Sequence, residues 1–152
     1  MVYAWAEDGH IFAVERLEDV PEQYRNSVVV FEDLTAKDVS KLYIDDGEIR
    51  VKDEQMLVSE KREEVKRLLI DKAEKFITET LKKHGYYSLG DLLVYAQSGS
   101  QEAIELLSWY KQFDAKVWDF IETQLGQKSL QELESFDIDS FLNNIATEAG
   151  NV

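Results

Sequence analysis

The sequence predicts an α+β protein, with a small antiparallel β part at the N-terminus followed by a C-terminal α-helical bundle. In the first third of the chain, Asp-Gly pairs stand between short β-branched or aromatic runs, and such pairs are typical two-residue hairpin turns. Farther along, apolar residues recur with helical spacing between serine and aspartate cap signals. We therefore expect a β domain over residues 1–58 and a helical domain over residues 59–152.

The first hairpin is expected to turn at Asp8-Gly9. A two-residue turn at this point pairs Trp5 with Phe12 and Tyr3 with Val14. Because side chains alternate between the two faces of a strand, these four share one face of the hairpin.

A second hairpin is expected to turn at Asp46-Gly47, pairing Ile44 with Ile49. Between the two hairpins, Ser27–Phe31 is a β-branched run that favours a further strand. The stretch Asp53–Val58 carries neither pattern, and we expect it to connect the two domains.

The helical domain is expected to open with a long connecting helix over residues 59–84. Ser59 is an N-cap candidate for this helix, and Gly85 is a candidate for the residue that ends it. Ser88 with Asp91 fits the capping box of a short second helix.

A break at Ser98–Ser100 predicts the start of a third helix, which we expect to end at Gly126. Ser129 predicts another short helix, and Asp139 is the expected cap of the last one. The role of residues 127–152 stays open between packing on the bundle and reaching a partner.

The third helix contains the aromatic-rich stretch LLSWYKQFDAKVWDFIETQL. At about 100° of rotation per residue, one continuous apolar face includes Trp109, Phe113 and Phe120, which we expect to form core. Trp118 falls on the opposite side, near Leu107 and Leu125. Three interpretations follow: the helix is buried on all sides, the Trp118 side meets a partner, or the aromatics line a cofactor pocket, which the sequence favours least.

Charge narrows the classes of partner. The chain has 31 acidic and 17 basic residues, a formal net charge of −14. Residues 1–58 and 85–152 are strongly acidic, whereas residues 59–84 carry a small basic excess. Because phosphate backbones and anionic lipid repel such a chain, we expect neither a nucleic-acid nor a membrane partner. No secretion signal or apolar run of about 20 residues is visible.

The sequence also lacks recognisable catalytic chemistry. There are no cysteines, and neither His10 nor His84 has a second ligand at metal-binding spacing. The clusters Asp45-Asp46 and Asp137–Asp139 lack the register of a calcium loop, and no phosphate-cradling glycine motif is present. We therefore expect a non-enzymatic protein without catalytic residues, cofactor or metal.

Aromatic and small residues recur in a characteristic order through the helical part. Tyr87-Ser88 is followed by Tyr95-Ala96, by the polar break Ser98–Ser100, by Trp109 and by Val117-Trp118. In this pattern, YYSLGDLLVYAQSGSQEAIELLSWYKQFDAKVWDFIETQL resembles the C-terminal helical region of small bacteriophage tail proteins. These proteins are encoded beside tail-fibre genes and are described as tail-fibre assembly proteins or chaperones. An acidic, β-rich N-terminal part is also similar to this group.

The resemblance covers residues 60–125 best, and residues 127–152 have no counterpart. It also departs from the group at Tyr110-Lys111-Gln112, because a basic and then an acidic residue typically follow the tryptophan there.

The resemblance implies a chaperone that holds a phage tail-fibre or receptor-binding subunit while three chains fold and trimerise. Such a protein acts in the bacterial host cytoplasm during phage assembly or stays in the virion tail, and a homo-oligomer is compatible with it. Exposed aromatics and an open sheet edge suit this role, because an immature fibre exposes apolar surface and unpaired strands. The residues that we expect to contact the partner are Trp118, Leu107, Leu125, Tyr3, Trp5 and Phe12.

An alternative is an acidic phage-encoded inhibitor that mimics nucleic acid and blocks a host nucleic-acid enzyme. A mimic needs rows of carboxylates spaced like a phosphate backbone. The basic excess of residues 59–84 interrupts the acidic parts, so the charge layout favours the chaperone interpretation.

Overall fold

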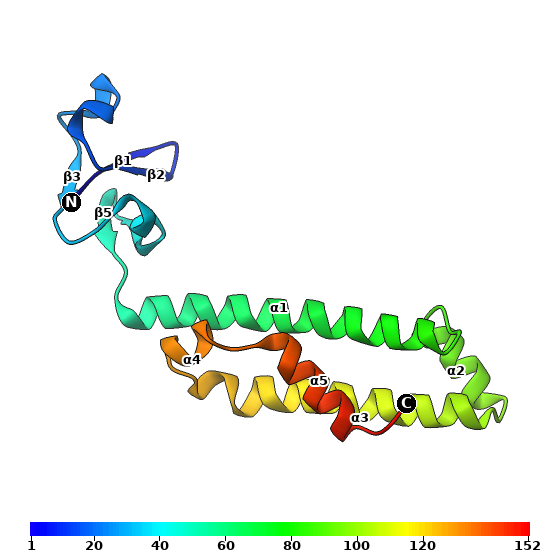
Figure 1. The fold of residues 1–152 in the computed structure, drawn as a ribbon. Helices are drawn as coiled ribbons and strands as arrows, with labels where there is room; N and C mark the ends of the chain where they lie inside the picture. Colours follow the sequence, from blue (N-terminus) through cyan, green and yellow to red (C-terminus); the bar gives the residue numbers. More distant parts are fainter. The chain divides into compact units, whose positions relative to one another are not determined.

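The computed structural model describes residues 1–152 and confirms the predicted α+β class. Short antiparallel strands occupy the N-terminal part, and helices follow them (Figure 1). The chain divides into two compact units, residues 1–57 and residues 58–152.

Three strands form the first sheet of the N-terminal unit: β1 (Val2–Glu7), β2 (His10–Val14) and β3 (Val29–Phe31). Their order is β2-β1-β3, and both pairings are antiparallel. The hairpin register agrees with the prediction, since Trp5 pairs with Phe12. Asp8 and Gly9 have φ angles of 51° and 78°, the left-handed values that a tight hairpin turn requires.

The second hairpin consists of β4 (Leu42–Asp45) and β5 (Glu48–Val51), with the predicted pairing of Ile44 with Ile49. Three short 3₁₀ helices occupy the connections, and η3 and β4 lie against β2. Their bounds are η1 (Leu17–Asp19), η2 (Glu22–Tyr24) and η3 (Ala36–Lys41). Few side chains are buried in this unit: Val2, Ala4, Trp5, Val20 and Leu42.

Helix α1 (Glu54–Lys83) begins five residues earlier than expected. The Asp53 carboxylate accepts a hydrogen bond from the Met56 backbone N–H at 2.8 Å, which is N-cap geometry. The prediction of a connector over Asp53–Val58 and of Ser59 as the cap was therefore wrong. Asp53 supplies the carboxylate that satisfies the first free N–H groups of the helix.

Helices α2 (Leu89–Gln97) and α3 (Gln101–Thr123) begin at the predicted caps. The Ser88 hydroxyl accepts from the Asp91 N–H, and the Ser100 hydroxyl accepts from the Ala103 N–H. Helix α3 ends at Thr123 and gives way to the 3₁₀ helix η4 (Leu125–Gln127), so the expected end at Gly126 was wrong.

The last 26 residues pack on the bundle through α4 (Leu130–Glu134) and α5 (Ile138–Glu148). Ser129 and Glu132 form the capping box of α4. The cap of α5 is Asp137, whose carboxylate accepts from the Ser140 N–H, and not Asp139 as predicted.

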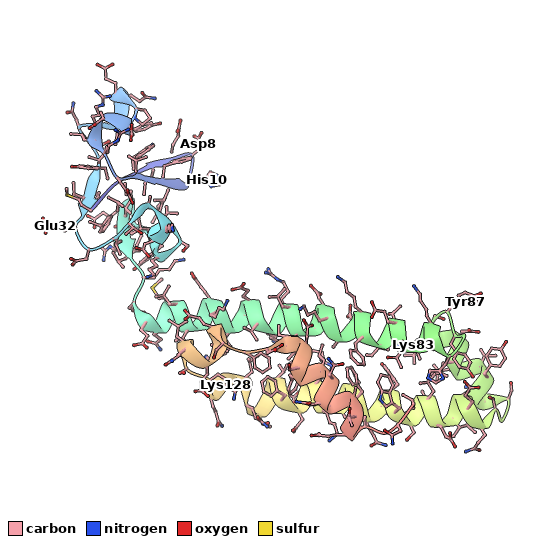
Figure 2. All side chains as sticks on the ribbon, viewed as in Figure 1. Asp8, His10, Glu32, Lys83, Tyr87 and Lys128 are labelled. Atoms are coloured by element: carbon pink, nitrogen blue, oxygen red, sulfur yellow. The ribbon has the colours of Figure 1, made fainter.

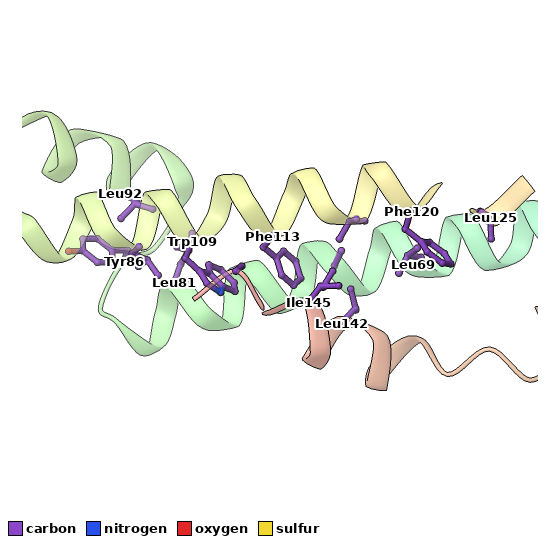
Figure 3. Packing of buried hydrophobic residues seen from close by; sticks show 14 of the residues in the cluster. Leu69, Leu81, Tyr86, Leu92, Trp109, Phe113, Phe120, Leu125, Leu142 and Ile145 are labelled. Carbon is purple, nitrogen blue, oxygen red and sulfur yellow. The ribbon is translucent and has the colours of Figure 1, made fainter. Parts of the chain in front are cut away.

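One apolar core unites these helices, and Figure 3 shows ten of its side chains by name. Helix α1 contributes residues four apart, such as Val65, Leu69 and Ala73, and α3 contributes residues three or four apart. The rings of Trp109 and Phe113 stack at a centroid distance of 5.1 Å. Such spacing places the apolar side chains of each helix along one side. Helices α1 and α3 run antiparallel, and their apolar sides pack against each other (Figures 1 and 3).

The C-terminal segment is joined to this core by polar contacts as well. The Trp109 Nε1–H donates to the backbone oxygen of Ala146 at 3.0 Å, and Lys72 pairs with Asp139 at 3.0 Å. No helix of the structure combines the length and the apolar composition that are needed to cross a membrane.

Candidate partner-binding surfaces

The aromatic side chains of the first hairpin have different exposures. Trp5 is only 7% exposed, because its ring lies between Phe12 at 5.6 Å and Tyr24 of η2 at 6.2 Å. Phe12 is 44% exposed on the outer strand β2, and Tyr3 is half-buried. The expectation that Trp5 contacts a partner therefore has to be corrected: its ring is interior, and Phe12 is the accessible aromatic.

Two polar groups of this aromatic cluster are unusual. Trp5 Nε1 is buried without a hydrogen-bond acceptor. The pKa of the Tyr24 hydroxyl is raised, first by burial and then by its hydrogen bond to the Glu7 carboxylate. Both features come from the way η2 folds over the hairpin, which no local sequence pattern predicts.

The three residues of the predicted surface at Trp118 also differ in exposure. Trp118 is 41% exposed, whereas Leu107 is half-buried against the core and Leu125 is buried within it. The inclusion of Leu125 was wrong because it assumed helical rotation beyond Thr123, where α3 has ended. The face opposite Trp109 exposes Trp118 and also Ile104, which is 43% exposed. The prediction of Trp109, Phe113 and Phe120 as core is confirmed.

A further apolar surface was missed by sequence reasoning. It surrounds α2 and consists of Tyr87, Leu93, Val94 and Tyr95 together with Gly90; we call it the α2 surface. Tyr87 is 86% exposed and Val94 is 60% exposed. Figure 2 shows Tyr87 at the turn between α1 and α2, with its side chain directed away from the bundle. The one signal in the sequence was the apolar run Leu92–Ala96, which extends over more of the helix circumference than a single buried side needs.

His84 and members of both acidic clusters make structural contacts. His84 Nδ1 lies 3.2 Å from a Glu102 carboxylate oxygen. In the cluster Asp137–Asp139, Asp137 caps α5 and Asp139 pairs with Lys72. In the cluster Asp45-Asp46, Asp45 lies 3.5 Å from Arg50. No group of three or more His, Cys, Asp or Glu side chains is arranged to hold a metal ion.

Capping also explains the carboxylates with shifted pKa values. The pKa of Asp137 is lowered, chiefly by the hydrogen bond from the Ser140 backbone N–H. The pKa of Glu132 is lowered in the same way by Ser129, and that of Asp38 by Thr35. In each case donors at a helix N-terminus favour the charged carboxylate.

Shallow grooves run along α1. One of about 290 Å³ is lined in part by Ile77, Tyr87 and Tyr110, between α1 and the start of α2. The pKa of Tyr110 is raised, first by burial and then by the nearby Asp114 carboxylate. Another groove of about 320 Å³ lies by His84, Trp109 and the C-terminal residues.

Comparison of the chain with protein-family models, with curated proteins and with solved structures gives no match.

Proposed function

We propose that this protein is a non-enzymatic assembly chaperone that binds a phage tail-fibre or receptor-binding subunit during folding and trimerisation. The observation that carries the proposal is the exposure of two aromatic side chains: Phe12 on the outer strand β2 is 44% exposed, and Trp118 on α3 is 41% exposed. The proposal rests in addition on the resemblance of residues 60–125 to tail-fibre assembly proteins.

The physical requirements of a chaperone match these features. A client that has not yet trimerised exposes apolar side chains and unpaired strand edges. Trp118 offers a large apolar ring with a polar N–H, and the outer strand β2 carries Phe12 beside an edge without a further strand. The net charge of −14 keeps a protein with such side chains soluble and limits nonspecific association.

The direct test is co-expression with a candidate fibre subunit, followed by size exclusion and mass measurement. The proposal predicts that fibre trimers become soluble only when this protein is present, and that a complex or its release is observed. If fibre solubility is unchanged and the two proteins never associate, the chaperone proposal is wrong. Screening host nucleic-acid enzymes for inhibition then tests the alternative of an acidic mimic.

Trp118→Asp separates binding from folding. Because Trp118 is 41% exposed, we expect this change to lower the free energy of unfolding by less than about 1 kcal/mol. Capture of the fibre subunit should fall at least severalfold. Trp109→Asp is the matched control: that ring is 2% exposed and donates to Ala146, so the same change should unfold the helical unit.

Phe12→Ser tests the sheet edge without removing a strand. Deletion of residues 1–15 is unsuitable for this purpose, because β1 is the central strand of the sheet and its loss removes the whole sheet. We expect Phe12→Ser to preserve the hairpin and to weaken client capture. Unchanged capture by both the Phe12 and the Trp118 variants would exclude these two side chains as contacts.

A further inference from the structure

Helix α3 carries a partly buried carboxylate that has no partner within the chain. Only three of the 31 acidic residues, Asp38, Asp91 and Asp114, are half-buried, and the others are exposed. Asp38 pairs with Lys41 at 3.1 Å, and Asp91 accepts the backbone N–H of Tyr87 at 3.1 Å. Asp114 has neither a hydrogen bond nor an ion pair. Because a charge that is partly withdrawn from water is destabilised unless it is paired, Asp114 is the carboxylate that gains most from a partner.

Aromatic side chains flank Asp114 on both sides along α3. Tyr110 lies one turn before it and Trp118 one turn after it, so the three side chains share one face of the helix; we call them the α3 row. Because helical side chains lean toward the N-terminus, the indole of Trp118 covers the turn that carries Asp114. Burial, and after it the charge of the Asp114 carboxylate, raises the pKa of Tyr110, so these two side chains lie close together. The row is open to solvent at Trp118, which is 41% exposed.

The surroundings of the α3 row provide no cation for this carboxylate. Glu74 of α1 lines the neighbouring groove of about 290 Å³, has no ion pair, and shares that groove with no lysine or arginine. Lys116 pairs with Glu148 at 3.3 Å. Lys111 precedes Asp114 by three residues, the less favourable order for a helical ion pair, and forms none. The charge of this face is therefore complementary to a cation that comes from another molecule.

We propose that the α3 row binds an arginine side chain of a partner protein. The guanidinium can pair with both carboxylate oxygens of Asp114 while its flat face stacks on the indole of Trp118. The apolar stem of the arginine can lie along the ring of Tyr110. A lysine ammonium lacks the planar fork and satisfies only the charge, and an anionic or purely apolar partner leaves Asp114 without a counter-charge. The net charge of −14 attracts a basic segment from a distance and so increases the rate of encounter.

The binding test uses N-acetyl-argininamide as the probe and N-acetyl-citrullinamide as its uncharged isostere. The ¹H–¹⁵N NMR spectrum of the full chain contains three indole signals, one for each tryptophan, and Trp118→Phe identifies the signal of Trp118. We expect the arginine probe to shift this signal with a dissociation constant of about 1–10 mM, since it makes one charged pair and one cation–π contact. The citrulline probe should bind at least about fivefold more weakly, and added salt should weaken the arginine probe.

Asp114→Asn is the test variant, and Asp119→Asn is its matched control. Both changes remove one negative charge from α3, but Asp119 is rotated by about 140° from Asp114 around the helix. Neither carboxylate has a partner within the chain, so both variants should keep the melting temperature of the unmodified protein. We expect Asp114→Asn to raise the dissociation constant of the arginine probe at least about fivefold, and Asp119→Asn to change it less than about twofold.

The proposal is overturned if the arginine probe leaves the Trp118 signal unmoved, or if the citrulline probe binds equally well. It is also overturned if Asp119→Asn weakens binding as much as Asp114→Asn does.

The proposal rests on the proposed function for the identity of the partner, a client subunit, and fibre capture is therefore measured separately. A chain that binds the arginine probe through Asp114 but captures no fibre subunit supports the arginine site and removes the chaperone proposal. Fibre capture that is lost in Trp118→Asp but unchanged in Asp114→Asn supports the chaperone proposal and overturns the arginine site.

Discussion

The two units of this protein are stabilised in different ways. The helical unit, residues 58–152, has one continuous core to which all of its helices contribute. The β unit, residues 1–57, buries few side chains around a central strand and depends on two tight turns and a single tryptophan. Small units bury a small share of their surface, so we expect the β unit to be the less stable of the two.

The largest effect is expected from Phe113→Ala in the helical core. Phe113 is fully buried and its ring stacks with Phe76 at 5.2 Å and Trp109 at 5.1 Å. Its truncation should lower the free energy of unfolding by about 3–5 kcal/mol, measured by urea titration followed by circular dichroism. Ile104→Ala, 43% exposed on the same helix, should cost under about 1 kcal/mol. Equal effects at both positions would contradict the core as described.

Trp5→Ala should break the β unit selectively. Loss of this ring removes the partner of both Phe12 and Tyr24 and should cost about 3 kcal/mol. Limited proteolysis is the measurement: we expect cleavage within residues 1–57, while residues 58–152 stay resistant. Trp5→Phe should cost less, because it keeps an aromatic ring and removes an N–H that has no acceptor. Simultaneous loss of the helical unit in Trp5→Ala would show that the two units unfold together.

A glycine-to-alanine change in each unit tests the comparison with smaller expected effects on stability. Gly9 has φ +78°, so Gly9→Ala should destabilise the β unit by about 1–2 kcal/mol. Gly126 has no such φ, and a Cβ added there would meet no atom within 4 Å, so Gly126→Ala should leave the melting temperature almost unchanged. Thermal denaturation of the pair tests whether turn geometry matters more in the β unit.

The smallest effect is expected at acidic pH. The pKa of Asp137 is lowered in the folded state, so the unfolded state binds its proton first as the pH falls. The stabilisation by this carboxylate is present above its ordinary pKa of 3.8 and is lost as the pH falls below that value. Asp137→Asn keeps an effective N-cap and should flatten the acid limb of the stability curve while changing little at neutral pH. If the acid limb keeps its steepness in Asp137→Asn, other carboxylates cause the loss of stability at acidic pH.

The sequence was most informative where local chemistry decides the structure. Asp8-Gly9 determined the first hairpin and its register, and Ser88, Ser100 and Ser129 marked true helix starts. In α3 the apolar spacing identified the buried face correctly. These features depend on residues within a few positions of one another.

The errors arose where the outcome depends on distant contacts or on competing signals. At the start of α1, both Asp53 and Ser59 are residue types that cap helices, and the same holds for Asp137 and Asp139 at the start of α5. The local pattern alone therefore does not determine which residue of each pair is the N-cap. The burial of Trp5 requires η2 to fold over the hairpin. The exposure of α2 could not be predicted, because its apolar sequence is typical of a covered helix and only the tertiary structure shows which side has no neighbour.

The three tryptophans of this chain occupy three different environments: Trp5 in the β unit, Trp109 in the helical core and Trp118 at the surface, with exposures of 7%, 2% and 41%. An indole in apolar surroundings emits at shorter wavelength and is shielded from soluble quenchers, whereas an exposed one is not. The protein therefore contains its own optical reporters. Replacing two of the three tryptophans by phenylalanine leaves a single indole. Trp5 alone then reports melting of the sheet, Trp109 alone reports melting of the bundle, and Trp118 alone reports occupation of the outer face of α3.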